Sequence, residues 1–99
     1  MSKIQAHEAA VTSVVDLDDG QHIATGSYDK KINIFSMARC QKLLTLDNRA
    51  SVTAMVITSD KSRLVTAGLD KSVSIWTVIR RNGVPLDLSR MLKESLTRR

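Results

Sequence analysis

The sequence is poor in cysteine, proline and aromatic residues. Its 99 residues include one cysteine, one proline, one tryptophan, one tyrosine and one phenylalanine. The single cysteine, Cys40, cannot form a disulfide within the chain, which favours a reducing compartment, the cytoplasm or the nucleus. Three aromatic residues also offer few platforms on which nucleic-acid bases could stack.

Long apolar runs are missing as well. No stretch approaches the roughly 18 apolar residues that cross a bilayer, so we expect no transmembrane helix. Residues 1 to 5 carry no apolar segment of the kind that a secretory signal needs, so none is expected. With 42% hydrophobic and 25% charged residues, the composition is that of a folded globular chain, and its length suits one small domain.

Residue patterns for catalysis or metal binding are not evident. His7, His22 and Cys40 lack the spacing of a zinc site. The segment from Asp16 to Gly20 lacks the alternating oxygen ligands and the closing glutamate of a calcium loop, and is interpreted as a turn. No local signature of a nucleophile with its base occurs. We therefore expect no enzyme activity, no catalytic residue, no metal and no cofactor.

The sequence contains two copies of one unit. Shifted by 41 positions, Val11–Val15 aligns with Val52–Val56, and Ile23–Phe35 aligns with Leu64–Trp76 without a gap. Ten of the 31 aligned positions from 9 to 39 are identical. Such a match indicates a repeat architecture.

Each unit has the pattern of four short strands. In the first unit, a β-branched run over residues 11–17 ends at a turn signal, and a second run covers residues 22–27. Residues 32–35 alternate between apolar and polar side chains, which is typical of a half-buried strand. A fourth run covers residues 41–46. About 40 residues with four strands and no crossover helix predict an antiparallel meander.

The two units resemble WD-repeat blades of a β-propeller over residues 4 to 79. The family pattern has a histidine before the first strand, a serine or threonine on the second, an aspartate in the next turn and an aromatic residue ending the third. We call these four residues a tetrad. The matching residues are His7, Thr25, Asp29 and Phe35 in the first unit, and Asn48, Thr66, Asp70 and Trp76 in the second.

This sequence departs from the family pattern in its details. Phe35 lacks the N–H group that a tryptophan would contribute to the first tetrad. Asn48 replaces the histidine of the second tetrad but can still donate a hydrogen bond. The residues after the aromatic positions are Ser36 and Thr77, where the family has aspartate. These departures weaken the match at the tetrad positions more than they weaken the assignment of the fold.

The C-terminal region differs from the repeats in charge and pattern. Residues 80–99 contain six basic and two acidic residues, so they hold +4 of the chain's net charge of +5. The basic residues are Arg80, Arg81, Arg90, Lys93, Arg98 and Arg99. Leu88, Met91, Leu92 and Leu96 recur at helical spacing and predict a basic amphipathic helix over about residues 88–97. It could pack on a blade, enter a partner's groove, or contact RNA or an anionic membrane.

The expected fold is all-β, a partial propeller of two four-stranded antiparallel blades with a short C-terminal helix. Residues 1–5 would form the outer strand of a neighbouring or closing blade. Residues 6–46 would form the first blade, residues 47–79 the second, and residues 80–99 the basic tail. Two blades leave two faces uncovered, which predicts partner blades from a longer chain, from self-association, or from another incomplete propeller.

The resemblance implies a noncatalytic scaffold that binds other proteins. Family members commonly bind partners on the face that carries the loops before the first strand and after the second. The matching positions are Ala10, Thr12, Tyr28, Ser51, Thr53 and Leu69. Tyr28 is the strongest candidate, because aromatic residues dominate binding hot spots. The alternative function is a component of a ribonucleoprotein or nucleic-acid-associated assembly that contacts phosphates through the basic tail.

Overall fold

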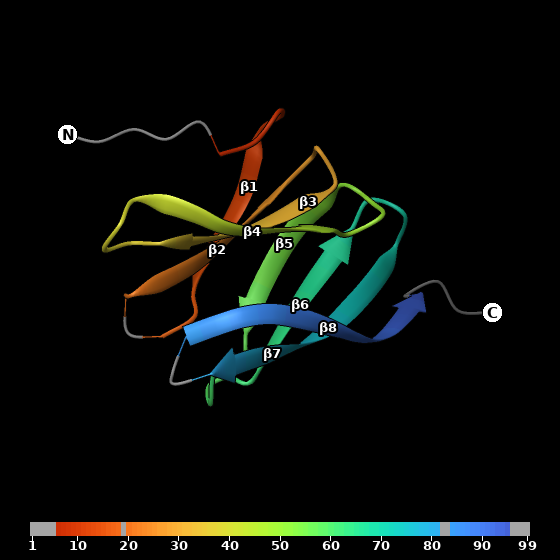
Figure 1. Cartoon of the computed structure of the whole chain (residues 1–99). Helices are drawn as coiled ribbons and strands as arrows, with labels where there is room; N and C mark the ends of the chain where they lie inside the picture. Colours follow the sequence, from red (N-terminus) through yellow and green to blue (C-terminus); the bar gives the residue numbers. More distant parts are fainter. Residues whose placement is uncertain (1–5, 19, 82–83, 96–99) are drawn as a thin grey trace.

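The computed structural model describes residues 6–18, 20–81 and 84–95, with side chains described up to Arg80. These residues form eight strands (Figure 1). The strands of the first unit are β1 (Val11–Asp16), β2 (His22–Ser27), β3 (Lys31–Ser36) and β4 (Gln41–Asp47). Those of the second unit are β5 (Val52–Ile57), β6 (Arg63–Gly68), β7 (Ser72–Arg81) and β8 (Val84–Ser95). The described part of the chain contains no helix with the length and apolar character needed to cross a bilayer.

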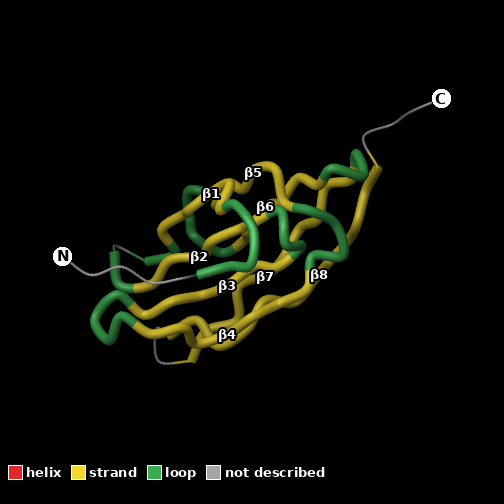
Figure 2. The backbone as a smooth tube through the Cα atoms, turned by 90° about the horizontal axis from the view of Figure 1, so that it is seen from above, coloured by secondary structure: helices red, strands yellow, loops and turns green. Residues whose placement is uncertain are grey.

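Each repeat unit forms one sheet of four antiparallel strands in sequence order. The first sheet has the order β1-β2-β3-β4 and the second has the order β5-β6-β7-β8. Figure 2 shows the two sheets side by side, with β1 and β5 on one side of the molecule and β4 and β8 on the other. The prediction of an all-β chain with two four-stranded blades is confirmed.

Strand register assigns each side chain to one of two faces of its sheet, because paired residues share a face. In the first sheet, Val15 pairs with Ala24, and Ala24 pairs with Ile34. This face packs on the second sheet, and we call it the back face of the first sheet. In the second sheet, Leu64 pairs with Trp76 on the face that points to the first sheet, which we call its front face.

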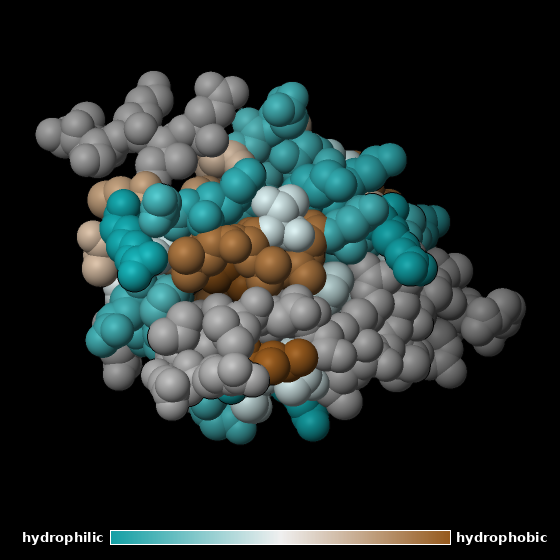
Figure 3. All heavy atoms as spheres, viewed as in Figure 1, coloured by the Kyte–Doolittle hydropathy of each residue, from teal (hydrophilic) through white to brown (hydrophobic). Residues whose placement is uncertain are grey.

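The hydrophobic core lies between these two faces. It consists of Leu17, Ala24, Ile32 and Ile34 from the first sheet, and Val52, Met55, Leu64, Trp76 and Val78 from the second. Leu44 and Leu46 of β4 pack against it from the outer side. The space-filling view shows an apolar area in this region, between β4 and β8 (Figure 3). One sheet therefore covers one face of the other, and the opposite face of each remains outside the core.

Close approach of the two sheets depends on a glycine. A Cβ atom placed on Gly26 in β2 would lie 2.6 Å from Cγ1 of Val52 and 3.1 Å from Sδ of Met55. Both neighbours belong to β5 and to the core. The absence of a side chain at Gly26 is what lets β5 pack tightly across β2.

Polar side chains also join the two sheets. The guanidinium of Arg80 donates from Nη2 to the carbonyl of Leu17, at 2.6 Å, and from Nη1 to the carbonyl of Lys61, at 2.8 Å. The ammonium of Lys61 donates to the carbonyl of Asp16 at 3.2 Å. Arg80 thus belongs to the junction between the sheets, which corrects its assignment to a separate basic tail.

The helix expected over about residues 88–97 is wrong for the described residues, because residues 84–95 form strand β8. β8 pairs with β7 along its length and completes the second sheet, so this sheet extends to Ser95 rather than ending at residue 79. Of the tail cations, Arg81 ends β7, and Arg90 and Lys93 lie in β8. Residues 1–5, Arg98 and Arg99 lie outside the described residues, and so does the outer strand expected at 1–5.

Two features of the sequence explain this error. Register shifts interrupt the pairing of β7 with β8, and the extra residue at one of them is Met91, because Leu92 pairs with Ile75 and Arg90 with Trp76. An extra residue in a strand lengthens the spacing between successive apolar residues from two positions to three. A spacing of three is also typical of one face of a helix. The other feature is Asn82-Gly83, which stands between the paired residues 81 and 84. Asn-Gly is the strongest short-range hairpin signal, and the prediction of a helix over residues 88–97 did not take it into account.

Replacing Arg80 with methionine keeps the length of the side chain and removes both hydrogen bonds to backbone carbonyls. We expect Arg80→Met to lower the free energy of unfolding by about 1–3 kcal/mol, because hydrogen bonds from a charged group contribute about that much. Urea denaturation followed by circular dichroism measures the change. Arg39→Met is the matched control, since Arg39 occupies the same repeat position and is exposed. Equal effects of the two substitutions would contradict the role of Arg80.

Candidate functional site

The first tetrad is built around His7, which lies in the loop before β1. Its Nδ1 lies 2.9 Å from Oδ2 of Asp29, and its Nε2 lies 2.7 Å from Oγ1 of Thr25. A neutral imidazole has one donor and one acceptor nitrogen. Because a carboxylate only accepts, Nδ1–H donates to Asp29, and in the neutral form of the ring Nε2 then accepts the hydroxyl proton of Thr25. The tetrad therefore ties the entering loop to β2 and to the turn after it.

Asp29 is the centre of this turn. Besides His7, its carboxylate accepts hydrogen bonds from the backbone N–H of Glu8, at 3.0 Å, and of Lys31, at 2.8 Å. Partial burial raises the pKa of Asp29, but the hydrogen bonds from Glu8, Lys31 and His7 together outweigh it, so the pKa lies below its ordinary value of 3.8. The ionised carboxylate is the form that holds the loop and the turn together.

The second tetrad contains a chain of hydrogen bonds through Thr66. The indole Nε1 of Trp76 donates to Oγ1 of Thr66 at 3.2 Å, and that hydroxyl donates to Oδ1 of Asn48 at 2.9 Å. Asn48 in turn donates from Nδ2 to the carbonyl of Ala50 at 3.0 Å. Asp70 accepts from the backbone N–H of Ser72 at 3.1 Å and from the hydroxyl of the same residue. Asn48 therefore binds the threonine hydroxyl of the second tetrad at the position where the family pattern has histidine.

The two tetrads differ in what covers them. Thr66 and Trp76 lie on the front face of the second sheet, inside the core. Thr25 and Phe35 lie on the corresponding front face of the first sheet, which the other described sheet does not cover. Phe35 is 4% exposed and provides no N–H group to Thr25. Both sets hold loops and strands in place through these hydrogen bonds.

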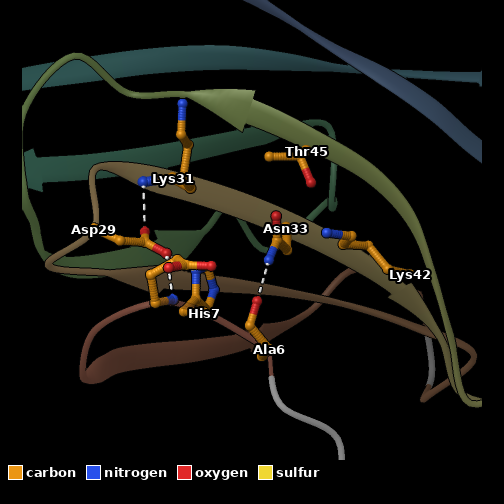
Figure 4. Close-up of a pocket in the computed structure, with 8 residues that line it drawn as sticks. Ala6, His7, Asp29, Lys31, Asn33, Lys42 and Thr45 are labelled. Carbon is orange, nitrogen blue, oxygen red and sulfur yellow. Dashed lines mark hydrogen bonds and ion pairs between the residues drawn. The ribbon is translucent and has the colours of Figure 1, made fainter.

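Two hollows lie on the front face of the first sheet. One, of about 330 Å³, is lined mainly by apolar side chains, among them Val14, Ile23 and Phe35. The other, of about 250 Å³, is polar (Figure 4). In it, Asn33 donates from Nδ2 to the carbonyl of Ala6 at 2.6 Å, while its buried Oδ1 has no hydrogen-bond partner among the described residues. Within the same described ranges, no cluster of three or more histidine, cysteine, aspartate or glutamate residues could hold a metal ion.

The six partner-contact candidates separate into two groups. Thr12 and Thr53 form the first group, whose hydroxyls bond to backbone carbonyls of neighbouring strands. Thr12 Oγ1 donates to the carbonyl of Val52 at 2.8 Å and lies 3.2 Å from that of Gly26, while Thr53 Oγ1 donates to the carbonyl of Ala67 at 3.2 Å. Thr12 therefore links the two sheets. Sequence reasoning missed this role, because one strand pattern does not reveal what the neighbouring sheet presents.

The remaining candidates form one rim of the molecule. The hydroxyl of Ser51 donates to the carbonyl of Tyr28 at 2.7 Å, and the backbone N–H of Leu69 donates to the carbonyl of Ser51 at 3.0 Å. The backbone N–H of Tyr28 donates to the carbonyl of Ala10 at 3.1 Å. Tyr28 is 48% exposed and Leu69 is 63% exposed. The backbones of two equivalent turns, each of which carries an exposed apolar side chain, are thus joined through one serine.

Comparison with known proteins agrees with this architecture. The family model described as "WD domain, G-beta repeat" matches residues 1–36 and 40–77. The chain therefore belongs to the WD-repeat family, whose members form β-propeller blades, and the resemblance inferred from the two tetrads is confirmed. No curated protein matches the sequence significantly.

Solved structures of WD-repeat domains share the fold. The β-propeller domain of Cps50 (Swd1) from Myceliophteria thermophila superposes with a TM-score of 0.75 at 19% identity, over 86% of this chain and 28% of that one. U3-55K superposes with a TM-score of 0.78 at 19% identity, over 92% of this chain and 28% of that one. A chain of the Mitotic Checkpoint Complex superposes with a TM-score of 0.74 at 22% identity, over 92% of this chain and 29% of that one. The chain thus spans between a quarter and a third of the length of these relatives.

The second tetrad can be tested by removing one hydroxyl. Thr66→Val keeps the shape of the side chain and removes the two hydrogen bonds that its hydroxyl makes with the Trp76 indole and the Asn48 carbonyl. We expect the free energy of unfolding to fall by about 1–3 kcal/mol, because each of the two buried hydrogen bonds contributes about 0.5–1.5 kcal/mol. Thr45→Val, at an exposed position of β4, is the matched control and should change it by less than about 0.5 kcal/mol. Chemical denaturation measures both, and a Thr66→Val variant as stable as the control would contradict the role of the hydroxyl.

The lowered pKa of Asp29 predicts how acid acts on the first tetrad. A carboxyl whose pKa is lower in the folded chain contributes stability above its unfolded pKa and loses it as the pH falls through the folded pKa. We expect Asp29→Asn to be less stable than the natural chain at pH 7, and the difference to shrink as the pH falls below about 3.8. Denaturation midpoints of both proteins from pH 7 to 2 measure this. A difference that stays constant over this range would contradict it.

Proposed function

We propose that the chain contributes two blades to a noncatalytic WD-repeat scaffold that assembles other proteins, and that it contacts a partner through the rim of Tyr28, Ser51 and Leu69. The family supports the general part of this proposal, because propellers of this type serve mainly as interaction platforms. Fold alone does not identify a binding site, so the specific part rests on the rim.

The observation that carries the proposal is that two exposed apolar side chains stand on turns whose backbones are hydrogen-bonded to one serine. Tyr28 and Leu69 occupy equivalent turns of the two units, and Ser51 bonds to the backbone of both. An exposed tyrosine provides a large contact area at a low cost in side-chain entropy, which is why tyrosine is enriched at hot spots. Because the turns are held by backbone hydrogen bonds, a partner would meet a preorganised surface.

The proposal extends to cellular context. A relative of known structure is a chain of the Mitotic Checkpoint Complex, an assembly by its name, which supports an assembly role for the present chain. The proposed compartment is the cytoplasm or the nucleus, supported by the single cysteine. We do not extend the proposal to nucleic acid. Arg80, one of the cations considered for phosphate contact, bonds to the backbone carbonyls of Leu17 and Lys61 instead.

Truncating both exposed side chains of the rim tests the proposal. We expect the Tyr28→Ala, Leu69→Ala double variant to lose most of the proteins that the natural chain captures from its source, because truncation of a hot-spot residue costs about 2 kcal/mol or more in binding. Affinity purification with quantitative mass spectrometry measures the captured proteins. Leu43→Ala on the outer strand β4 is the matched control, since this leucine is also exposed, and it should capture them normally. A folded double variant that keeps every partner would contradict the proposal.

A further inference from the structure

One polar pair in the first unit belongs neither to the tetrad nor to the core. Asp18 lies in the turn between β1 and β2, and His22 is the first residue of β2. The carboxylate of Asp18 accepts the backbone N–H of His22 through Oδ1 at 2.7 Å, and its Oδ2 lies 2.8 Å from Nδ1 of the imidazole. Two contacts with one carboxylate fix the orientation of the ring.

The turn itself does not need this pair. Asp16 accepts the backbone N–H groups of Asp18, at 3.0 Å, and of Gly20, at 2.8 Å, and so holds the turn. In the second unit, the residues 41 positions later are Ser59 and Arg63, so neither a carboxylate nor an imidazole stands there. The pair is thus specific to the first unit, which points to a role other than folding of the repeat.

The second ring nitrogen of His22 has no partner among the described residues. Because a carboxylate only accepts, Nδ1–H donates to Asp18, and Nε2 of the neutral ring is then an acceptor. His22 is only 9% exposed, yet Nε2 remains accessible, since the inaccessible unpartnered side-chain atoms of the described residues are Ser13 Oγ and Asn33 Oδ1. A nearly buried acceptor of this kind binds a donor from solvent or from a ligand.

His22 lines a hollow of about 260 Å³ at the junction between the two sheets. It pairs with Ser36, and alternation along the strands places both on the back face of the first sheet, with Ala24 and Ile34. The second sheet packs on this face, so the neighbouring sheet on this side is already part of the chain. The hollow lies where β2 begins, at the end of the sheet opposite the rim.

Two hydrogen-bond donors line the same hollow. The hydroxyl of Ser36 accepts the backbone N–H of Arg39 at 3.3 Å, and its own proton can still be donated. Arg39 is exposed in the turn between β3 and β4, and its guanidinium has no ion pair or hydrogen bond with a described residue. The hollow therefore combines one fixed acceptor, on His22, with two donors, of which one is a cation.

We propose that this hollow binds hydrogen phosphate, an oxyanion that keeps one O–H group at neutral pH. The O–H donates to Nε2 of His22, while Arg39 and Ser36 donate to the other oxygens. Asp18 acts as a positioning residue, because it keeps the ring proton on Nδ1. Sulfate has the same shape and charge but no proton, so it would leave Nε2 unpaired and bind more weakly. The proposal is independent of the rim.

NMR titration of the ¹⁵N-labelled chain with phosphate and with sulfate tests the proposal, at about pH 8, where histidine side chains are ordinarily neutral. We expect phosphate to shift the Nε2 resonance of His22 with a dissociation constant of about 1 mM. Sulfate at the same ionic strength should bind about tenfold more weakly, the effect of one unpaired polar group. No shift at about 20 mM phosphate, or equal binding of the two anions, would overturn the proposal.

Asp18→Asn tests the acceptor role of Nε2. The asparagine carbonyl can still accept the backbone N–H of His22, but its amide group donates to Nδ1, so the ring proton moves to Nε2. We expect this variant to bind sulfate as well as it binds phosphate, a change of preference that loss of stability alone would not produce. A folded Asp18→Asn variant that keeps the preference for phosphate would overturn the proposal.

Arg39→Met tests the cation and decides the question if Asp18→Asn is unfolded by circular dichroism. We expect it to weaken phosphate binding by about tenfold, because it removes a charge-assisted hydrogen bond. Arg49→Met is the matched control, since Arg49 is also exposed but lies beside the rim, and it should bind phosphate normally. Equal effects of the two substitutions would show that only the net charge matters and would overturn the site.

Discussion

The structure depends on one contact, the packing of one sheet's back face on the next sheet's front face. A four-stranded meander of this size cannot enclose a core, so its apolar residues are buried only when another sheet lies against them. The chain satisfies this need once, through the cluster around Ile34 and Trp76. Gly26 permits the close approach, and Arg80 and Thr12 supply hydrogen bonds across the junction.

Much of this architecture was predictable from the sequence. The 41-residue repeat predicted the number of sheets. Alternation predicted that Ile32 and Ile34 share a face, and both lie in the core, but the half-buried strand expected there is wrong, because Asn33 and Phe35 on the other face are buried too. The tetrad pattern predicted that His7, Thr25 and Asp29 meet, and they lie within hydrogen-bond distance. These are properties of a single unit, and a single unit's pattern is visible in its own residues.

The errors concern relations between units or between distant strands. β8 was predicted as a helix because the register shift at Met91 is set by pairing with β7, which a local period cannot reveal. Arg80 was assigned to the tail because its carbonyl partners, on Leu17 and Lys61, lie 63 and 19 positions away in the sequence. Thr12 and Ser51 appeared free for a partner because the sequence does not show the sheet against which they pack.

Strand β8 also gives the basic residues near the C-terminus a different meaning. It is twelve residues long and lies at the edge of its sheet, so none of the other described strands pairs with the outer side of its backbone. An open edge of this length is a template for intermolecular β-pairing and amyloid-like growth. Natural proteins discourage such growth by placing lysine, arginine and proline on edge strands, and Pro85, Arg90 and Lys93 all lie on β8. The positive charge that suggests a ligand therefore belongs to an open sheet edge, where like charges disfavour pairing with another copy of the same strand.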